Sequence, residues 1–181
     1  MFNIKTILCP TDFSENSLAA LDVAAEFAER FDAELHVLHV LPLLGASFDL
    51  ATLGVPDMLP PMEDQRHEVL VELEDVVAKR VTEGFLPECE VRIGDPAETI
   101  DNFALEIGAD LIVISTHGRT GWRHLVFGSV AEAVVRTAAC PVLTVRALPT
   151  GATPSRKLKR PATKVSNETN VSQTAQAFAV S

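Results

Sequence analysis

The sequence predicts an α/β fold, in which five parallel strands form an open sheet with helices on both faces. Short apolar runs alternate with longer amphipathic segments in the order βαβαβαβαβ, and this alternation is typical of a parallel sheet. The runs are almost continuously apolar, as expected for strands that are covered on both faces. Parallel crossovers are right-handed, which restricts the possible topologies, and we expect the strand order 3-2-1-4-5.

The apolar runs are short, as strands usually are. They span residues 5–10, 34–41, 88–93, 110–115 and 141–146. The fourth run is the most apolar, so we expect it to be central in the sheet. The last run is expected to form an edge.

Four amphipathic segments are predicted to be helices. They span about residues 15–31, 63–83, 96–107 and 129–138. Ser14 and Asp95 are the expected N-caps, because such side chains accept hydrogen bonds from first-turn N–H groups. The last helix is expected to turn four residues inward, namely Val130, Ala133, Val134 and Thr137. The prolines and glycines of residues 42–61 predict a long irregular loop.

Composition indicates one folded domain followed by a tail. The chain has 181 residues, of which 47% are hydrophobic and 22% charged, which is enough to bury a sizeable core. The net charge is −14 over residues 1–146 but +4 over residues 147–181, which are rich in Ser, Thr, Ala and Pro. We therefore expect a domain at 1–147 and a disordered, basic, Ser/Thr-rich tail at 148–181.

Several kinds of protein are disfavoured. A net charge of −10 argues against a general nucleic-acid binder. No apolar run approaches the ~20 residues of a membrane span, and the first residues lack the regions of a signal peptide. The three cysteines, Cys9, Cys89 and Cys140, are interpreted as reduced structural thiols of a cytoplasmic protein.

The predicted strand order places a ligand site. The order reverses beside the first strand, so a crevice should open between the carboxyl ends of strands 1 and 4, where such sheets bind ligands. Residues 10–13 follow the first strand, and residues 115–129 follow the fourth. These two segments are therefore the candidates for the chemistry.

The segment 115–129 has the features of an anion site. Gly118 and Gly121 allow close backbone approach to a ligand, and the N–H groups at the start of the Ser129 helix favour an anion. Basic or titratable side chains gather there in an otherwise acidic domain, namely His117, Arg119, Arg123 and His124. The alternative is that the glycines are plain turn residues and the arginines pair with surface acids. The combined features favour a bound phosphate chain.

At this point the chain resembles the universal stress protein family over about residues 1–147. The matching segments are TILCPTDFSENS, LHVL, GDPAETI and THGRTGWRHLVFGSVAEAVVRTAACPVLTVR. The resemblance implies a Rossmann-like fold similar to the adenine nucleotide alpha hydrolases. It also implies the nucleotide motif Gly-x2-Gly-x9-Gly-Ser/Thr, of which Gly118 and Gly128-Ser129 match the second half. Ser115 replaces the first glycine of that motif.

The resemblance also implies residue roles. Asp12 would hold the ribose hydroxyls or meet the base edge, beside a wall made by Pro10 and Thr11. Val40 would offer backbone hydrogen bonds to adenine, and Ile114 would line the adenine pocket. The residues around the sugar and phosphates would be Ser115, Gly118, Arg119, Thr120 and Gly121. The phosphate end would be held by Gly128, Ser129, Val130 and the N–H of Ala131. Asp12 has a structural alternative, as a cap at the start of the first helix.

Three functions compete on this basis. The first is a stress-response regulatory protein that binds ATP, with or without Mg²⁺, or a related adenine nucleotide, with little or no hydrolysis. The second is an interaction module of the same fold that binds no nucleotide, because of Ser115. The third is an enzyme that activates a substrate with ATP, which is disfavoured because the chain lacks a second domain and the signature of those ligases.

Two further expectations concern metals and partners. We expect His36 and His39 to share one face of the second strand, as packed core histidines rather than metal ligands, since no spacing completes a metal site. The last strand, residues 141–146, is expected to be an edge with an apolar alternation, and edges tend to pair. The resemblance implies a homodimer through this edge.

Overall fold

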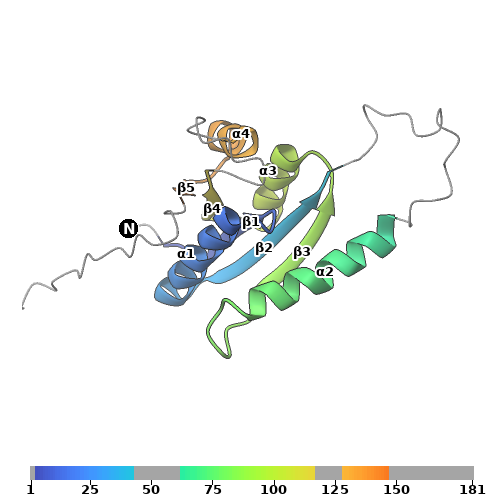
Figure 1. Cartoon of the computed structure of the whole chain (residues 1–181). Coiled ribbons are helices and arrows are strands. Elements are labelled where there is room, and N and C mark those ends of the chain that lie inside the picture. Colours follow the sequence, from blue (N-terminus) through green and yellow to red (C-terminus); the bar gives the residue numbers. More distant parts are fainter. Residues whose placement is uncertain (1–2, 43–61, 117–127, 147–181) are drawn as a thin grey trace, which may run out of the picture. The chain divides into compact units, whose positions relative to one another are not determined.

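The computed structural model describes residues 3–42, 62–116 and 128–146 of the chain (Figure 1). Five strands form one sheet: β1 (Thr6–Thr11), β2 (Glu34–Leu41), β3 (Glu88–Ile93), β4 (Leu111–Ser115) and β5 (Val142–Val145). All neighbouring pairs are parallel and the order is β3-β2-β1-β4-β5. The predicted fold class and strand order are therefore confirmed, with β4 inside the sheet and β5 at an edge.

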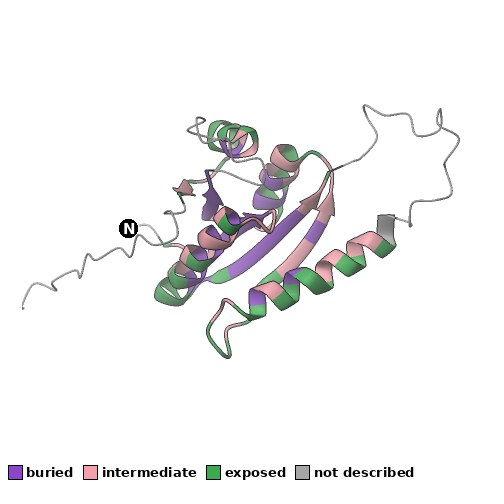
Figure 2. Ribbon diagram, viewed as in Figure 1, coloured by how far each residue is buried: buried purple, intermediate pink, exposed green. Residues whose placement is uncertain are grey.

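Four helices cover the two faces of this sheet. They are α1 (Glu15–Phe31), α2 (Met62–Ala78), α3 (Pro96–Glu106) and α4 (Ser129–Thr137). One apolar core lies between the sheet and α1 with α2, and a second lies between the sheet and α3 with α4. Successive residues of β1 serve the two cores in turn, because strand side chains alternate: Ile7 and Cys9 face the first core, and Leu8 faces the second. Figure 2 shows the buried positions concentrated on the sheet.

The helix starts follow the predicted capping. Ser14 Oγ accepts a hydrogen bond from Ser17 N at 3.2 Å. Asp95 Oδ1 accepts from Ala97 N at 3.1 Å and from Glu98 N at 3.0 Å. Both caps lie in the short turns that follow a strand, since β1 ends at Thr11 and β3 at Ile93, so they help to set where each helix begins.

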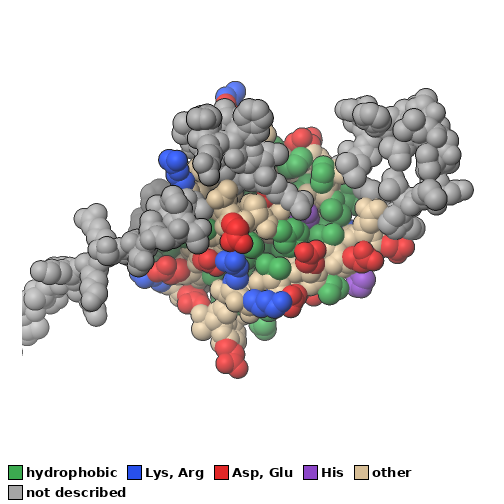
Figure 3. Space-filling view, in the orientation of Figure 1, with side chains coloured by type: hydrophobic (Ala, Val, Ile, Leu, Met, Phe, Trp, Pro, Cys, Tyr) green, Lys and Arg blue, Asp and Glu red, His purple; other side chains and the backbone are tan. Residues whose placement is uncertain are grey.

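Helix α2 ends at Ala78, five residues before the predicted end at Glu83. The N–H groups of Arg80 and Val81 both bond to the carbonyl of Val77, at 2.9 and 3.2 Å, so the final turn tightens and the helix stops. Acidic residues lie along the exposed side of α2, as Figure 3 shows.

None of the helices that the structure describes has the length and apolar character that crossing a membrane requires.

Helix α4 buries Val134 and packs Val130 against the core, as predicted, but its inward face differs at Thr137. Ala131 and Val134 are the buried positions, whereas Thr137 is exposed. The Thr137 hydroxyl donates to the carbonyl of Ala133 at 2.8 Å and also meets the Asp101 carboxylate of α3. A polar side chain at the helix end thus finds hydrogen bonds at the surface.

His36 and His39 lie on opposite faces of β2, so the expectation that they share a face is wrong. Residues three apart on a strand point in opposite directions. His36 packs against Phe103 of α3, with ring centroids 6.3 Å apart, while His39 packs against Phe13 at 4.6 Å on the α1 side. Among the described residues, no group of three or more His, Cys, Asp or Glu could hold a metal.

The cysteines are free thiols. Burial, and to a lesser extent Asp22, raises the pKa of Cys9 to about 12. Burial, followed by the charge of Glu74, raises the pKa of Cys89 to about 11. Burial also raises the pKa of Cys140. Because a thiolate is the reactive form, these shifts favour the protonated, less reactive thiols at neutral pH. The predicted boundary after residue 147 and the tail lie outside the described residues.

Candidate functional site

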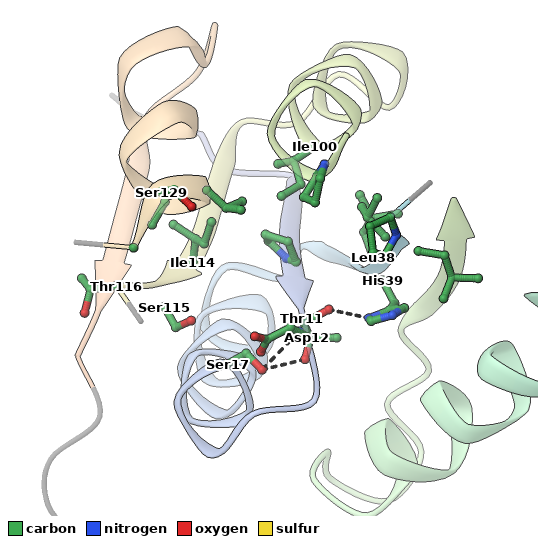
Figure 4. Close-up of a pocket in the computed structure, with 18 residues that line it drawn as sticks. Thr11, Asp12, Ser17, Leu38, His39, Ile100, Ile114, Ser115, Thr116 and Ser129 are labelled. Atoms are coloured by element: carbon green, nitrogen blue, oxygen red, sulfur yellow. Dashed lines mark hydrogen bonds between the residues drawn. The ribbon is translucent and has the colours of Figure 1, made fainter. Parts of the chain in front are cut away.

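A cavity of about 370 Å³ opens where β1 and β4 end (Figure 4). This is the crevice that the strand order predicts, because the chain crosses to opposite sides of β1. Its volume falls in the ordinary range of ligand pockets. The described residues that line it are Pro10, Thr11, Asp12, Ser17, Leu38, His39, Val40, Leu41, Pro42, Pro96, Ile100, Ile114, Ser115, Thr116, Gly128, Ser129, Val130 and Ala131.

One side of the cavity is apolar. Leu38 and Val40 of β2, Ile100 of α3 and Ile114 of β4 line it. The same four side chains belong to, or pack against, the core beneath α3 and α4, so the wall is a continuation of that core. Such a surface suits a flat apolar group such as a nucleobase.

The other side is polar and rich in hydroxyl groups. Thr11, Ser17, Ser115 and Ser129 all contribute to the lining. Among the described lining residues, Asp12 carries the one carboxylate. A ligand with many hydroxyl or phosphoryl oxygens can find hydrogen bonds along this side.

The N-terminus of α4 forms one end of the polar side of the cavity. Its N-cap is Gly128, which makes no side-chain capping bond. Glu132 N bonds to Gly128 O at 2.9 Å, so the N–H groups of Ser129, Val130 and Ala131 come before the first bond of the helix. These N–H groups and the helix dipole favour a negatively charged group at this end.

Asp12 lies in the turn between β1 and α1, at the edge of the cavity. Its Oδ1 accepts hydrogen bonds from the backbone N–H of Ser14 at 3.1 Å and from Ser14 Oγ at 2.6 Å. Ser14 is the N-cap of α1, so Asp12 braces the cap rather than serving as the cap. The carboxylate therefore has both a place in the lining and a structural role.

His39 joins the lining from β2 with its ring oriented by the backbone. Its Nδ1 lies 2.8 Å from the carbonyl oxygen of Thr11. Because a carbonyl oxygen only accepts, Nδ1 carries a proton. The ring is buried, and Phe13 stacks beside it. The sequence predicts a packed histidine here, and it does not indicate that His39 lines the cavity.

The structure brings together the predicted site residues that it describes. Ten line the cavity, namely Pro10, Thr11, Asp12, Val40, Ile114, Ser115, Gly128, Ser129, Val130 and Ala131. Gly118, Arg119, Thr120 and Gly121 lie outside the described residues, as do His117, Trp122, Arg123 and His124. Sequence reasoning missed Ser17, Pro96 and Ile100, whose helices begin at the same edge of the sheet as the predicted residues.

Ser115, which stands where the motif has its first glycine, ends β4 and is buried. Figure 4 shows its side chain at the wall of the cavity, between Thr116 and Asp12. The cavity of about 370 Å³ remains beside it. The Ser115 side chain therefore forms part of the wall without filling the cavity.

Comparison with known proteins places the chain in a family. The family model described as "Universal stress protein family" matches residues 3–146. The chain belongs to the universal stress protein family. A relative in Bacillus subtilis, Universal stress protein YxiE, is 35% identical over 152 residues, covering 81% of this chain and 100% of the relative.

Solved universal stress proteins share the fold. UspA from Lactobacillus plantarum matches with a TM-score of 0.65 and 26% identity, over 80% of this chain and 99% of that one. A universal stress protein from Archaeoglobus fulgidus, solved in complex with dAMP, matches with a TM-score of 0.50 and 25% identity, over 80% of this chain and 99% of that one. The resemblance stated from sequence is thus confirmed at the level of family and fold.

Proposed function

We propose that this universal stress protein binds an adenine nucleotide, ATP foremost, in the cavity at the ends of β1 and β4. The observation that carries the proposal is the cavity itself, which has an apolar wall on one side and the N-terminus of α4 on the other. A nucleotide has the same division between base and phosphates. The Archaeoglobus fulgidus relative solved with dAMP supports the same ligand class.

The proposed orientation follows from the lining. The base lies against Val40, Ile100 and Ile114, where apolar burial stabilises it. The sugar lies beside Asp12, whose carboxylate accepts hydrogen bonds from hydroxyl groups. The phosphates lie at Ser129 and the first N–H groups of α4. Any Mg²⁺ would arrive with the phosphates of the nucleotide.

We propose binding with little or no hydrolysis, as in a regulatory protein. Asp12 is the carboxylate of the described lining, and its Oδ1 already accepts two hydrogen bonds from Ser14. A carboxylate held in this way is better placed to bind a sugar than to activate water, since a general base must reach the proton it removes.

The test is isothermal titration with ATP, ADP, AMP and adenosine, together with thermal melting at saturating nucleotide. Ligand that binds only the folded state raises the melting temperature. We expect saturable binding of nucleotides and a higher melting temperature. If millimolar nucleotide gives no heat of binding and no change in melting temperature, the proposal is rejected. The second function, an interaction module that binds no nucleotide, would then remain. Phosphate or pyrophosphate release at several turnovers per second would instead support the enzyme.

We also propose that two copies pair through β5. Pro141 O and Val145 O accept hydrogen bonds from the β4 side, at 3.0 and 2.9 Å. Backbone groups alternate along a strand, so those of Val142 and Thr144 face away from β4, toward an edge that no other described strand occupies, and such edges tend to pair. We expect light scattering to give a dimer for the wild type and for Thr144→Val, and a monomer for Thr144→Pro, which removes an edge N–H. A monomeric wild type contradicts this pairing.

A further inference from the structure

Ser17 is a buried residue of α1 that lies at the edge of the cavity. Its residue exposure is 2%, yet it belongs to the cavity lining. Figure 4 shows its side chain beside Thr11 and Asp12, to which dashed lines join its oxygen. A buried hydroxyl group requires hydrogen-bond partners, so the contacts of Ser17 at the edge of the cavity require an explanation.

The hydrogen bonds around Ser17 allow one consistent assignment of protons. Ser17 Oγ donates its proton to Ser14 O at 2.9 Å. It then accepts from Asp12 N at 3.3 Å and from Thr11 Oγ1 at 3.0 Å. Ser14 Oγ also lies 3.4 Å from Ser17 Oγ, but its proton goes to the nearer Asp12 Oδ1 at 2.6 Å. Thr11 Oγ1 in turn accepts from Phe13 N at 3.2 Å. The Ser17 hydroxyl therefore joins three backbone groups of the β1–α1 turn, two directly and one through Thr11.

This turn needs such support because Phe13 has a φ of +64°. A bulky side chain in the left-handed region is a genuine outlier, and it persists only where its surroundings fix it. The Phe13 ring rests on His39, which is itself bonded to the carbonyl of Thr11. Ser17 supplies the buried link on the other side of the turn.

We propose that Ser17 is a positioning residue, whose hydroxyl holds the β1–α1 turn so that the Asp12 carboxylate faces the sugar of a bound nucleotide. The proposal rests on the proposed function. Ser14 fixes Oδ1 of Asp12, and Ser17 fixes its backbone N–H. With both ends held, the carboxylate is oriented before a ligand arrives, and this lowers the cost of binding.

The experiment compares AMP with 2′-deoxy-AMP by isothermal titration. It uses the wild type, Ser17→Ala, Asp12→Asn and the double variant. We expect the wild type to favour AMP about tenfold, as for a hydrogen bond to a charged acceptor. Ser17→Ala and Asp12→Asn should each reduce that preference to about twofold or less. The double variant should show the same AMP preference as Asp12→Asn alone, because both substitutions disrupt the same interaction between Asp12 and the sugar.

Two further variants separate positioning from stability. Val77→Ala opens a space in the core beneath α2, away from the cavity, so it should lower the melting temperature and leave the AMP preference intact. Thr11→Val removes the hydroxyl at the other end of the Ser17 link, so it should repeat the loss even if Ser17→Ala folds poorly. Alanine is a good helix former, so we expect Ser17→Ala to fold.

The outcomes distinguish this inference from the proposed function. A wild type that binds neither nucleotide contradicts the proposed function and removes the basis of the inference. A wild type that prefers AMP, with the preference unchanged in both Ser17→Ala and Thr11→Val, overturns the role of Ser17 alone. The role of Ser17 would also be overturned if the loss of AMP preference in the double variant equalled the product of the losses in Ser17→Ala and Asp12→Asn.

Discussion

Replacing Ser129 by Asp should stabilise the empty protein and weaken nucleotide binding. Ser129 is the exposed first residue of α4, after an N-cap, Gly128, that makes no side-chain capping bond. A carboxylate at this end of a helix interacts favourably with the dipole by about 0.3–1 kcal/mol. We therefore expect the free energy of unfolding to rise by about 0.5 kcal/mol.

The same carboxylate would stand where the phosphate of a nucleotide is proposed to bind. Two like charges 4 Å apart repel by about 4 kcal/mol at an effective dielectric constant of 20. Salt and water at this exposed position reduce that value, to about 1.4 kcal/mol. The affinity for AMP should then fall about tenfold, whereas adenosine, which has no phosphate, should bind as before.

Urea denaturation measures the first effect, and isothermal titration with AMP and adenosine measures the second. Ser129→Asn is the matched control, because it has nearly the same shape without the charge, and it should retain most of the AMP affinity. Equal losses for AMP and adenosine would show that the phosphate does not lie at α4. An unchanged AMP affinity in Ser129→Asp would refute the placement as well.

Three other predictions concern the fold and the glycine loop. Asp95→Ala should lower the free energy of unfolding by about 1 kcal/mol in urea, because it removes the N-cap of α3, and Asp95→Ser should recover most of it. Burial raises the pKa of Cys9 from 9.0 to about 12. The buried thiol's contribution to the free energy of unfolding is therefore complete below about pH 9 and is lost toward about pH 12. Urea denaturation across that range should show this fall in the wild type, and Cys9→Ala should lack the part of the fall that comes from Cys9. Gly118→Val should abolish nucleotide binding in titration while the empty protein melts almost unchanged; surviving binding would place the site elsewhere.

Much of the fold was predictable because local signals and topology agree. The strands are apolar runs between turn residues, and Ser14 and Asp95 are caps with short-range partners. Right-handed crossovers then restrict the topology, and the expected strand order places the crevice beside β1. Residues at the end of a strand or directly after it, such as Ser115 and Asp12, were therefore predictable site candidates.

Residues that reach the cavity from other elements were not predictable in the same way. Ile100 and His39 belong to a helix and a strand whose sequences show only packing. Ser17 lies within α1, where a buried serine shows no pattern of its own. Their place in the site arises from the convergence of several elements, which no local spacing records.

The errors at helix ends have a similar cause. Val81 continues the apolar spacing of α2 and still packs against the core, although the helix ends at Ala78. Periodicity reports that a side chain is buried, and it does not report whether the backbone is still helical. Thr137 shows the converse, since its hydroxyl bonds at the surface removed it from the expected inner face.

The most direct measurement of nucleotide binding in this cavity is a titration of the isotope-labelled protein with ATP, followed by the amide resonances in NMR spectra. The account predicts saturable shifts at Asp12, Val40 and Ala131, which come from three separate elements around the cavity. Leu73, in the core beneath α2, should stay unchanged. Unperturbed resonances at millimolar ATP, or shifts confined to α2, would contradict it.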